Sequence, residues 1–319
     1  MKRWVSFLLA LTMVTVLLVG CGTVGAKGTE ESATDTKLRV VATNFPCYDF
    51  ARAVGGQAAE VTMLLPPGAE SHSYEPTPKD ILKIQKCDLF IYVGGDSDAW
   101  VDTILKSAGK QVNTLRLVDC VPQLDEEISK GMTTREERAA GEPAEKDEHV
   151  WTAPANAAVI TEKIAARMEK LDAGSAKVYR AGAAAYEKQI RTLDSDYKSF
   201  FSGVKNKVMV FGDRFPLRYF AEEYGLTCYA AFPGCSTQTE PSAATIAYLT
   251  DRVQKEHLHT VYYIEFSNHL VADRIAEATG AGTAEFDTCH NVTARQMKDG
   301  ATYVSLMRGN LEMLKKTMQ

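Results

Sequence analysis

Short apolar runs alternate with amphipathic segments in the first part of the chain. The apolar runs are rich in β-branched residues and have the length of buried strands, while the segments between them have helical spacing. This order of elements, βαβαβαβ, predicts a parallel sheet covered by helices on both faces. The predicted strands are residues 38–43, 59–65, 88–94 and 113–118, and the predicted helices are residues 46–54, 79–85 and 98–107.

The same alternation begins again near residue 206. It predicts a second parallel sheet with its own helices, so the fold class is α/β with two lobes, residues 38–154 and residues 205–319. The predicted strands of the second lobe are residues 207–211, 226–231, 260–266 and 283–286, and its predicted helices are residues 215–224, 242–256, 268–279 and 298–317.

Residues 155–204 contain no convincing strand and join the two predicted lobes. Apolar residues recur there at near-helical spacing, and Asp172 and Ser175 are suitable helix starts. We expect one long interlobe helix that ends near Phe200, with about 27 residues and a length of roughly 40 Å. Such a helix would be a rigid connector along both lobes.

The N-terminus has the pattern of a bacterial lipoprotein signal peptide. A charged start precedes an apolar stretch over residues 4–20, and Leu18-Val19-Gly20-Cys21 has the form of a lipobox. We therefore expect a signal peptide over residues 1–21, lipidation of Cys21 and an extracytoplasmic protein anchored to the bacterial cell membrane. The alternative is a transmembrane anchor, but the apolar stretch is slightly short for a span of about 20 residues.

Composition and charge narrow the choice of partners. Residues 22–37 consist mainly of Gly, Thr, Ser and charged residues, which predicts a flexible tether. The net charge of −5 and the pI near 5.8 argue against a nucleic-acid partner and against a basic membrane-binding face. The charged residues 121–147 predict an exposed loop or a short helical insertion. Six cysteines besides Cys21 form no CxxC pair, so a zinc knuckle or thioredoxin motif is disfavoured.

Two of the six histidines lie in loops that suit ligand binding. His72 follows a predicted strand in a loop stiffened by four prolines, and His149 lies between Glu148 and Val150. In α/β proteins, ligands bind beyond the carboxyl ends of the strands. The two histidines therefore suggest a metal site, although each alone is a modest signal.

Several segments together resemble the metal-binding lipoproteins of zinc and manganese ABC importers. The resemblance covers nearly the whole mature chain, and no single segment would be specific. It implies two α/β lobes bridged by one long helix, with one divalent ion in the cleft between them. The segments are ATNFPCYDFA (42–51), GAESHSYEPTPKDI (68–81), CDLFIYVGG (87–95), EHVWTAP (148–154), RYFAEEYGL (218–226), TEPSA (239–243) and the terminal Tyr303 to Asn310.

The resemblance also implies a ligand set, which this chain matches only in part. In the family, three histidines and one acidic residue hold the ion. His72 and His149 match the first two histidines, and Asp287 matches the acidic residue after the last strand. The third histidine, at the start of the C-terminal lobe, is replaced by Gly212-Asp213-Arg214.

We expect His290, three residues after Asp287, to supply the missing imidazole. Asp213 or Asp287 would then be the anionic ligand, because a tetrahedral divalent site needs about four ligands. The alternatives are that His290 is an exposed loop residue and that Asp213 caps a helix or pairs with Arg214. If the ligand assignment holds, ring nitrogens of His72, His149 and His290 should approach one point, roughly 3–3.5 Å apart around a zinc ion.

Other polar residues near these segments have simpler interpretations. His257 and His259 are expected in a solvated turn, His269 is a weaker ligand candidate, and Glu240 is expected to cap or brace a loop. Glu148 could act as a general base or as an outer-sphere partner of His149. Cys235 and Cys289 are expected in loops facing the cleft, as a disulfide, as a thiolate ligand or as buried thiols.

The favoured function is extracytoplasmic capture of a divalent metal ion and its delivery to an ABC importer permease, with no catalysis. The alternatives are an adhesin-like surface lipoprotein with the same fold and, less favoured, a surface metallohydrolase. The sequence contains no HExxH or GxSxG motif for hydrolysis. Imidazole ligands favour Zn²⁺. Mn²⁺ is the alternative, because the zinc-binding members of the family that the chain resembles often have a histidine-rich loop, and residues 121–147 contain no such loop.

Overall fold

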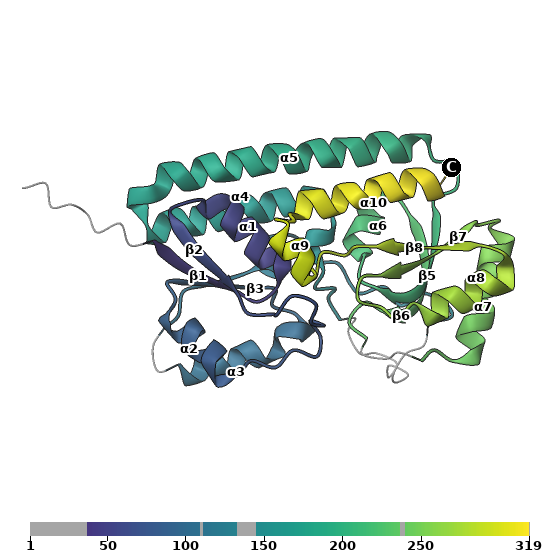
Figure 1. The fold of residues 1–319 in the computed structure, drawn as a ribbon, viewed down its shortest axis with the longest axis horizontal. Coiled ribbons are helices and arrows are strands. Elements are labelled where there is room, and N and C mark those ends of the chain that lie inside the picture. The colour runs from purple at the N-terminus through teal and green to yellow at the C-terminus, as the bar shows by residue number, and fades with distance from the viewer. Residues whose placement is uncertain (1–36, 109–110, 133–144, 237–239, 319) are drawn as a thin grey trace, which may run out of the picture. The chain divides into compact units, whose positions relative to one another are not determined.

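The computed structural model describes residues 37–108, 111–132, 145–236 and 240–318. The expected signal peptide, Cys21 and all of the tether before residue 37 lie outside the described residues, as do residues 133–144 of the charged segment. Figure 1 shows the two lobes side by side, with helices running along both. None of the helices formed by the described residues combines the length and the hydrophobicity needed to cross a membrane.

The N-terminal lobe is built on a four-stranded sheet in the order β2-β1-β3-β4, with every neighbouring pair parallel. Helix α2 begins at a capping box, in which Thr77 and Asp80 bond each other's backbone N–H, and Pro78 occupies the first turn. The strands are β1 (Leu38–Ala42), β2 (Ala59–Met63), β3 (Leu89–Tyr92) and β4 (Thr114–Arg116), and the helices are α1 (Phe45–Gly55), α2 (Pro78–Lys86) and α3 (Ala99–Ser107).

The C-terminal lobe repeats this arrangement with the parallel order β6-β5-β7-β8. Its register shifts between Phe211 and Arg214, so β5 continues through a bulge to Phe215. The strands are β5 (Val208–Phe215), β6 (Thr227–Pro233), β7 (Thr260–Ile264) and β8 (Gly282–Phe286), and the helices are α6 (Arg218–Tyr224), α7 (Ala243–Lys255), α8 (Leu270–Thr279), α9 (Ala294–Lys298) and α10 (Tyr303–Thr317).

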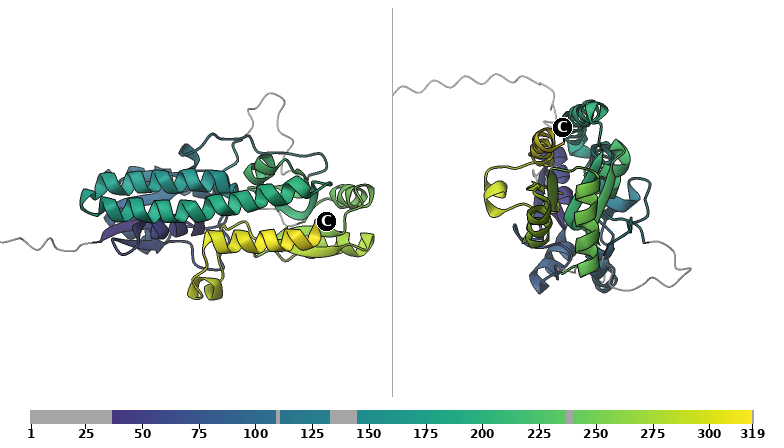
Figure 2. Two further views of the ribbon diagram at one scale, coloured as in Figure 1. Left: turned by 90° about the horizontal axis from the view of Figure 1, so that it is seen from above. Right: turned by 90° about the vertical axis from the view of Figure 1, so that its right-hand side faces the viewer.

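Two helices connect the lobes. Helix α4 (Pro154–Leu171) leads into α5 (Ala176–Gly203), and the two pack along each other, as Figure 2 shows from above. Helix α5 has 28 residues, so it extends for about 42 Å at 1.5 Å per residue. The long connector was expected, whereas α4 was not separated from it by the sequence pattern.

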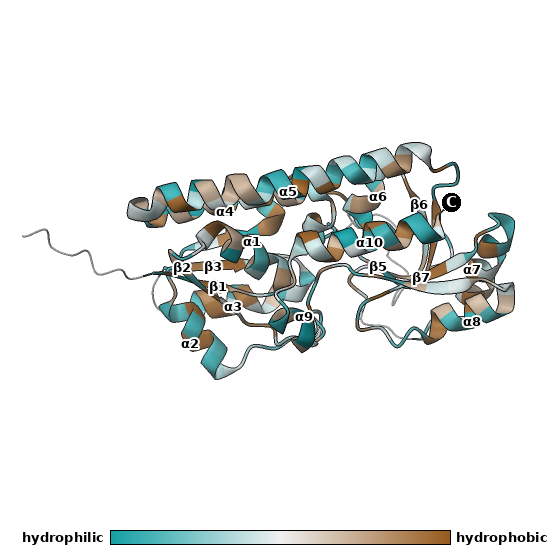
Figure 3. Cartoon of the chain, turned by 45° about the horizontal axis from the view of Figure 1, so that its top comes forward, coloured by the Kyte–Doolittle hydropathy of each residue, from teal (hydrophilic) through white to brown (hydrophobic). Residues whose placement is uncertain are grey.

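One apolar core is shared by both lobes. It includes Phe50 of α1, Tyr186 and Tyr197 of α5, Phe220 of α6 and Leu311 of α10. The opposite face of each sheet has a smaller core of its own, under α2 and α3 in one lobe and under α7 and α8 in the other. Figure 3 shows the apolar strands between the helices, and the short helix α9, which has no buried residue, appears mostly hydrophilic.

The predicted fold class is confirmed, since both lobes contain a parallel sheet and a long helix runs along them. All eight predicted strands are present within a few residues of their expected limits. The main difference is at residues 212–215, because residues 212–214 were expected to form a loop and residue 215 to begin a helix, whereas all four belong to β5.

Candidate metal centre

Four side chains from both lobes converge in the cleft. They are His72, Glu148, His149 and His290, and one potential ligand atom of each lies within 4.8 Å of those of the others. The imidazole centroids are 5.7 Å apart for His72 and His149, 5.4 Å for His72 and His290, and 4.7 Å for His149 and His290. The three histidines converge, as the sequence led us to expect, but the limit of 4.8 Å is wider than the roughly 3–3.5 Å expected around a bound ion.

The converging atoms share an unusual property. The Nε2 atoms of His72, His149 and His290 and the Oε1 atom of Glu148 are buried, and none has a hydrogen-bond partner among the described residues. Buried polar atoms are normally hydrogen-bonded, because their desolvation is otherwise unfavourable. These four atoms belong to the four converging side chains, so together they form a donor set that a cation would satisfy.

His149 is fixed by its neighbour Asp147. Oδ1 of Asp147 lies 3.0 Å from His149 Nδ1 and also accepts the backbone N–H of His149 at 2.8 Å. This bond to Nδ1 leaves Nε2 to face the other ligands. Gly234 permits the close approach of the loop after β6, since a Cβ there would lie 3.1 Å from His149 Cε1.

Glu148 completes the group, although the sequence did not suggest it as a ligand. Its Oε2 atom accepts the backbone N–H of Ser97 at 3.1 Å, which leaves Oε1 directed at the histidines. Gly95 makes room for this side chain, because a Cβ at Gly95 would lie 2.0 Å from Glu148 Oε2. These contacts come from the loop after β3, so no local pattern around Glu148 reveals them.

His290 lies beyond the end of β8. Its Nδ1 atom is 2.8 Å from the hydroxyl of Thr288, and that hydroxyl donates to Oε1 of Glu265 at 2.6 Å. The indole of Trp151 packs edge-on against the His290 ring, with centroids 4.9 Å apart. The backbone between Thr288 and His290 is kinked, since Cys289 has a φ of 61°.

His72 is placed by a loop that contacts the other lobe. Oε2 of Glu70 accepts the backbone N–H of Ser73 at 2.9 Å, and Oε1 of Glu70 accepts from Nη1 of Arg214 at 3.0 Å. His72 Nδ1 also lies 3.8 Å from Glu148 Oε1. The His72 loop is therefore held partly by a residue of β5.

Burial and charge set the protonation of the cluster. Burial, and then the positive charge of a protonated His149, lower the pKa of His72 to about 3. The same two causes lower the pKa of His290 well below its ordinary value. Burial is the largest single influence on His149 and opposes its charged form, but the charge and hydrogen bond of Asp147 together with the charges of Glu148 and Glu126 raise the pKa of His149. Burial raises the pKa of Glu148.

The two aspartates considered as anionic ligands lie outside this group. Asp213 accepts the backbone N–H of Arg214 at 2.8 Å and that of Ile264 at 3.3 Å, so it fastens the bulge of β5 to β7. Asp287 accepts the backbone N–H of Cys289 at 2.8 Å, and burial raises its pKa to about 6. The carboxylate in the group is that of Glu148.

The remaining candidates are also not members of the group. His257, His259 and Glu240 are exposed, and His269 is exposed with Nδ1 2.8 Å from Asp273 Oδ2. Cys235 and Cys289 are free thiols, so the structure contains no disulfide between them.

A small hollow beside the cluster adjoins a larger open one. The inner hollow, of about 20 Å³, is lined by His72, His290 and Glu265 among others, and could hold one water or ion. The outer hollow has a volume of about 360 Å³. Glu70, Arg214 and Phe266 line both hollows and so form the boundary between them.

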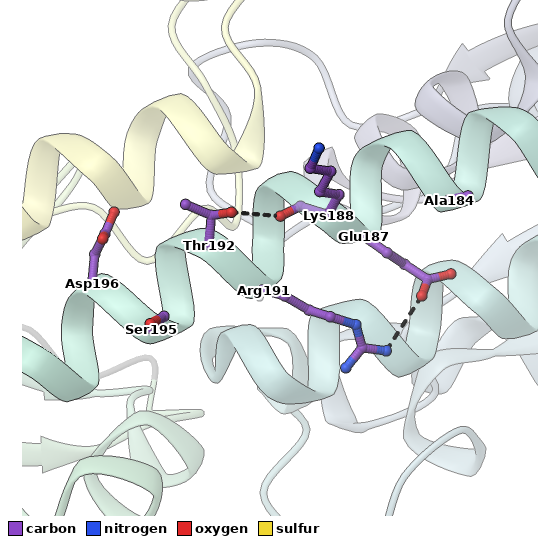
Figure 4. A pocket seen from close by; sticks show the side chains of 7 residues that line it. All are labelled: Ala184, Glu187, Lys188, Arg191, Thr192, Ser195 and Asp196. Carbon is purple, nitrogen blue, oxygen red and sulfur yellow. Dashed lines mark hydrogen bonds and ion pairs between the residues drawn. The ribbon is translucent and has the colours of Figure 1, made fainter.

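A hollow of about 570 Å³ lies elsewhere, on the outer surface of α5. Figure 4 shows its lining side chains, which include an Arg191–Glu187 ion pair of 3.3 Å and a Thr192 hydroxyl that donates to the Lys188 carbonyl at 2.9 Å. These groups bond to one another along one helix and do not converge on a common point. The cleft is therefore the better candidate for a functional site.

Comparison with known proteins identifies the family. Residues 40–317 match the family described as ZnuA, zinc-uptake complex component A, periplasmic. The chain is 31% identical over 321 residues to the high-affinity zinc uptake system protein ZnuA of Bacillus subtilis (strain 168), covering 99% of this chain and 98% of that protein. It is also 31% identical to the zinc-binding lipoprotein AdcA of Streptococcus pneumoniae (strain ATCC BAA-255 / R6), but spans only 61% of AdcA.

Solved structures of related proteins also match this chain. The crystal structure of the Zn(II)-bound ZnuA-like domain of Streptococcus pneumoniae AdcA matches with a TM-score of 0.74 and 31% identity, over 89% of this chain and 99% of that domain. A crystal structure of ZnuA matches with a TM-score of 0.73 at 18% identity, which supports the fold alone. Since the family match spans nearly all of the described residues, the chain belongs to the ZnuA family of solute-binding proteins for zinc uptake.

Proposed function

We propose that the protein captures Zn²⁺ outside the cytoplasmic membrane and delivers it to the permease of an ABC importer. The observation that carries this proposal is the set of four buried donor atoms without hydrogen-bond partners in the described structure, Nε2 of His72, His149 and His290 and Oε1 of Glu148. In this proposal the metal is cargo, so the site has to bind it and release it.

The donor types favour zinc over manganese. Three imidazoles and one carboxylate match the tetrahedral N/O coordination that Zn²⁺ adopts, whereas Mn²⁺ prefers more oxygen ligands and a higher coordination number. Ligand atoms of a tetrahedral zinc site lie about 3.3 Å apart. The ligand atoms of the four residues lie within 4.8 Å of one another, so only a small inward shift would bring them to that separation.

The electrostatics suit a cation with two charges. His72 and His290 have lowered pKa values, so they offer neutral imidazoles at neutral pH. Glu148 contributes one negative charge when it is ionised. A bound Zn²⁺ would favour this ionised form, because a nearby cation lowers the pKa of a carboxylic acid.

We also propose that lipidated Cys21 anchors the protein at the outer face of the membrane, near the permease. The lipobox Leu18-Val19-Gly20-Cys21 supports this, and the relative AdcA is named a lipoprotein. An intact-mass measurement of protein extracted from membranes tests the anchor. A mature chain that begins at Cys21 and carries acyl mass is expected, and an unmodified chain would disprove it.

The ligand set is tested by zinc affinity in a competition assay with a chromophoric chelator. We expect His72→Ala and His149→Ala each to weaken zinc binding at least about tenfold, or about 1.4 kcal/mol, because each removes one of four ligands. His269→Ala is a matched control, since this histidine is exposed and outside the group. Unchanged affinity in both His72→Ala and His149→Ala would disprove the proposed site.

Elemental analysis of protein purified without added metal tests the choice of ion. Zinc at about one equivalent per chain is expected from a single four-ligand site. Manganese as the main metal would contradict the proposal. The named relatives with 31% identity are zinc-uptake or zinc-binding proteins, which favours capture over the adhesin alternative.

A further inference from the structure

Two residues that follow β7 and β8 contact His290, the histidine expected to supply the imidazole that is missing from the family's ligand set. We propose that Thr288 and Glu265 are positioning residues that prepare His290 to bind the metal ion. The proposal rests on the proposed function, since it requires His290 to be a zinc ligand. It concerns residues that do not themselves contact the ion.

The first step concerns the proton on the His290 ring. A ring nitrogen that binds a metal carries no proton, so a neutral His290 bound through Nε2 must carry its proton on Nδ1. That N–H group is buried and needs an acceptor. The Thr288 hydroxyl oxygen lies 2.8 Å from Nδ1 and can accept this bond.

The second step concerns the hydroxyl proton of Thr288. A hydroxyl has only one proton, and it lies between two neighbours. The Thr288 hydroxyl is 2.6 Å from Oε1 of Glu265 and donates to it. The hydroxyl oxygen is then left to accept from His290. The relay from Glu265 through Thr288 to His290 thus leaves Nε2 with its lone pair directed at the cluster.

The third step concerns the backbone that carries the relay. Glu265 also accepts the backbone N–H groups of Thr288 at 2.7 Å and of His290 at 3.2 Å. Trp151 packs against the His290 ring and donates from Nε1 to the Thr288 carbonyl at 2.9 Å. One carboxylate and one indole therefore hold both the ring and the residue that orients it.

The local strain supports a functional role for this segment. Cys289, between the two relay residues, has a φ of 61°, in the left-handed region that non-glycine residues rarely adopt. Such a conformation is unfavourable and persists where surrounding contacts enforce it. Here the enforcing contact is the 2.8 Å bond from the Cys289 N–H to Asp287.

The test is the zinc affinity of Thr288→Val, which keeps the shape of the side chain and removes the hydroxyl. We expect zinc binding to weaken about 10–100-fold, the usual effect of losing an outer-sphere partner of a metal ligand. Thr288→Ser should recover most of the affinity because it restores the hydroxyl. Thr161→Val is a matched control, a buried threonine in α4 whose hydroxyl donates to the Ala157 carbonyl of the same helix.

A double-mutant cycle separates positioning from a general effect on folding. If Thr288 acts through His290, Thr288→Val should cause no further loss of zinc affinity in a His290→Ala background. A further loss of similar size there would overturn the proposal. So would wild-type affinity in Thr288→Val.

The same measurements distinguish this inference from the function on which it rests. If His290→Ala binds zinc as tightly as the wild type, the proposed ligand set fails and the positioning role fails with it. If His290→Ala binds weakly but Thr288→Val does not, only the positioning role is disproved. Thermal unfolding of the metal-free variants shows whether each one is folded.

Discussion

The negative charge of the cluster depends on the single carboxylate of Glu148. We expect Glu148→Gln to weaken zinc binding at least about tenfold, since a neutral amide is a poorer ligand for a dication than a carboxylate. The change keeps the size of the side chain, and the Ser97 N–H can still bond the amide oxygen. The measurement is a zinc competition titration of the variant against the wild type.

Asp287→Asn is the informative comparison for Glu148. Asp287 was the anionic ligand suggested by the sequence, but in the structure its Oδ1 atom bonds the Cys289 N–H. An asparagine oxygen can accept the same bond, so this variant should retain zinc affinity within about threefold, or roughly 0.7 kcal/mol. A larger loss in Asp287→Asn than in Glu148→Gln would show that Asp287 reaches the ion when the loops close.

The pH dependence of zinc binding should follow His149. Asp147 raises the pKa of His149, whereas His72 has a pKa of about 3 and stays neutral. Below the pKa of His149 a proton occupies the imidazole and zinc must displace it, so affinity falls as the pH decreases through that value. We expect this fall to begin above the ordinary histidine pKa of about 6.5.

Asp147→Asn tests whether Asp147 causes this pH dependence of zinc binding. Without the negative charge of Asp147, burial dominates and the pKa of His149 falls. The pH at which zinc affinity begins to fall should then move lower, as measured by titrations over about pH 5–8, where histidine titrates. An unchanged onset in Asp147→Asn would rule out this pair as the source of the pH dependence.

At the scale of elements, the loop after β3 shapes the site through a glycine. A Cβ at Gly95 would lie 2.3 Å from the Cβ of Glu148, so Gly95→Ala must displace this side chain or the loop. We expect weaker zinc binding and a loss of stability of about 1–3 kcal/mol, which is typical of overpacking. Zinc titration and thermal unfolding measure the two effects.

Gly203→Ala is the matched control for Gly95→Ala. Gly203 ends α5, and a Cβ there would meet nothing within 4 Å. Its zinc affinity should be unchanged and its stability equal or slightly higher, because alanine favours the helical state by up to about 1 kcal/mol. Equal behaviour of the two variants would mean that the loop after β3 can move without affecting Glu148.

The elements were largely predictable from the sequence because each strand is a short apolar run between polar turns. The parallel order followed from the alternation with helices. Helix α4 was not distinguished because residues 155–171 and α5 share an alanine-rich composition with charged residues. The extension of β5 was missed because Gly212 and Asp213 resemble loop residues, and only the bulge and the bond from Ile264 to Asp213 place them in the sheet.

The site was predictable where a single residue and its strand end suffice. His72 and His290 follow strand ends, whereas His149 was singled out by its neighbours and by the family resemblance; the structure places the three together. Glu148 was not assigned as a ligand because its orientation depends on contacts with Gly95 and Ser97. Ser97 is 51 residues before Glu148 in the sequence. Contacts between distant loops leave no periodic signal in the sequence.

At the scale of the molecule, the shared core restricts how the site can open. Aromatic residues of α1, α5, α6 and α10 form one continuous apolar cluster across both lobes. Separating the lobes would expose part of this cluster to water, at about 25 cal/mol per Å² of apolar surface. Movement of the loops at the cleft is less costly, so we expect the loops to control entry and release of the ion.

The Glu70–Arg214 ion pair is the contact best placed for this control. It joins the His72 loop to β5 with an N–O distance of 3.0 Å, and both residues line the inner and the outer hollow. If the pair is a gate, Glu70→Gln and Arg214→Gln should both release zinc about tenfold faster, an effect of about 1.4 kcal/mol on the barrier. Stopped-flow mixing with a chelator measures the release rate.

Because Glu70 and Arg214 carry opposite charges, the two variants together distinguish a gate from a purely electrostatic effect on the ion. If Glu70 and Arg214 acted only through their electric field on the ion, losing the anion would speed release and losing the cation would slow it. Only a gate predicts faster release from both. Asp88→Asn is the control, because its 2.7 Å ion pair with Arg39 lies at the opposite end of the N-terminal sheet. Slower release from Arg214→Gln would therefore reject the gate and leave electrostatic repulsion as the role of Arg214.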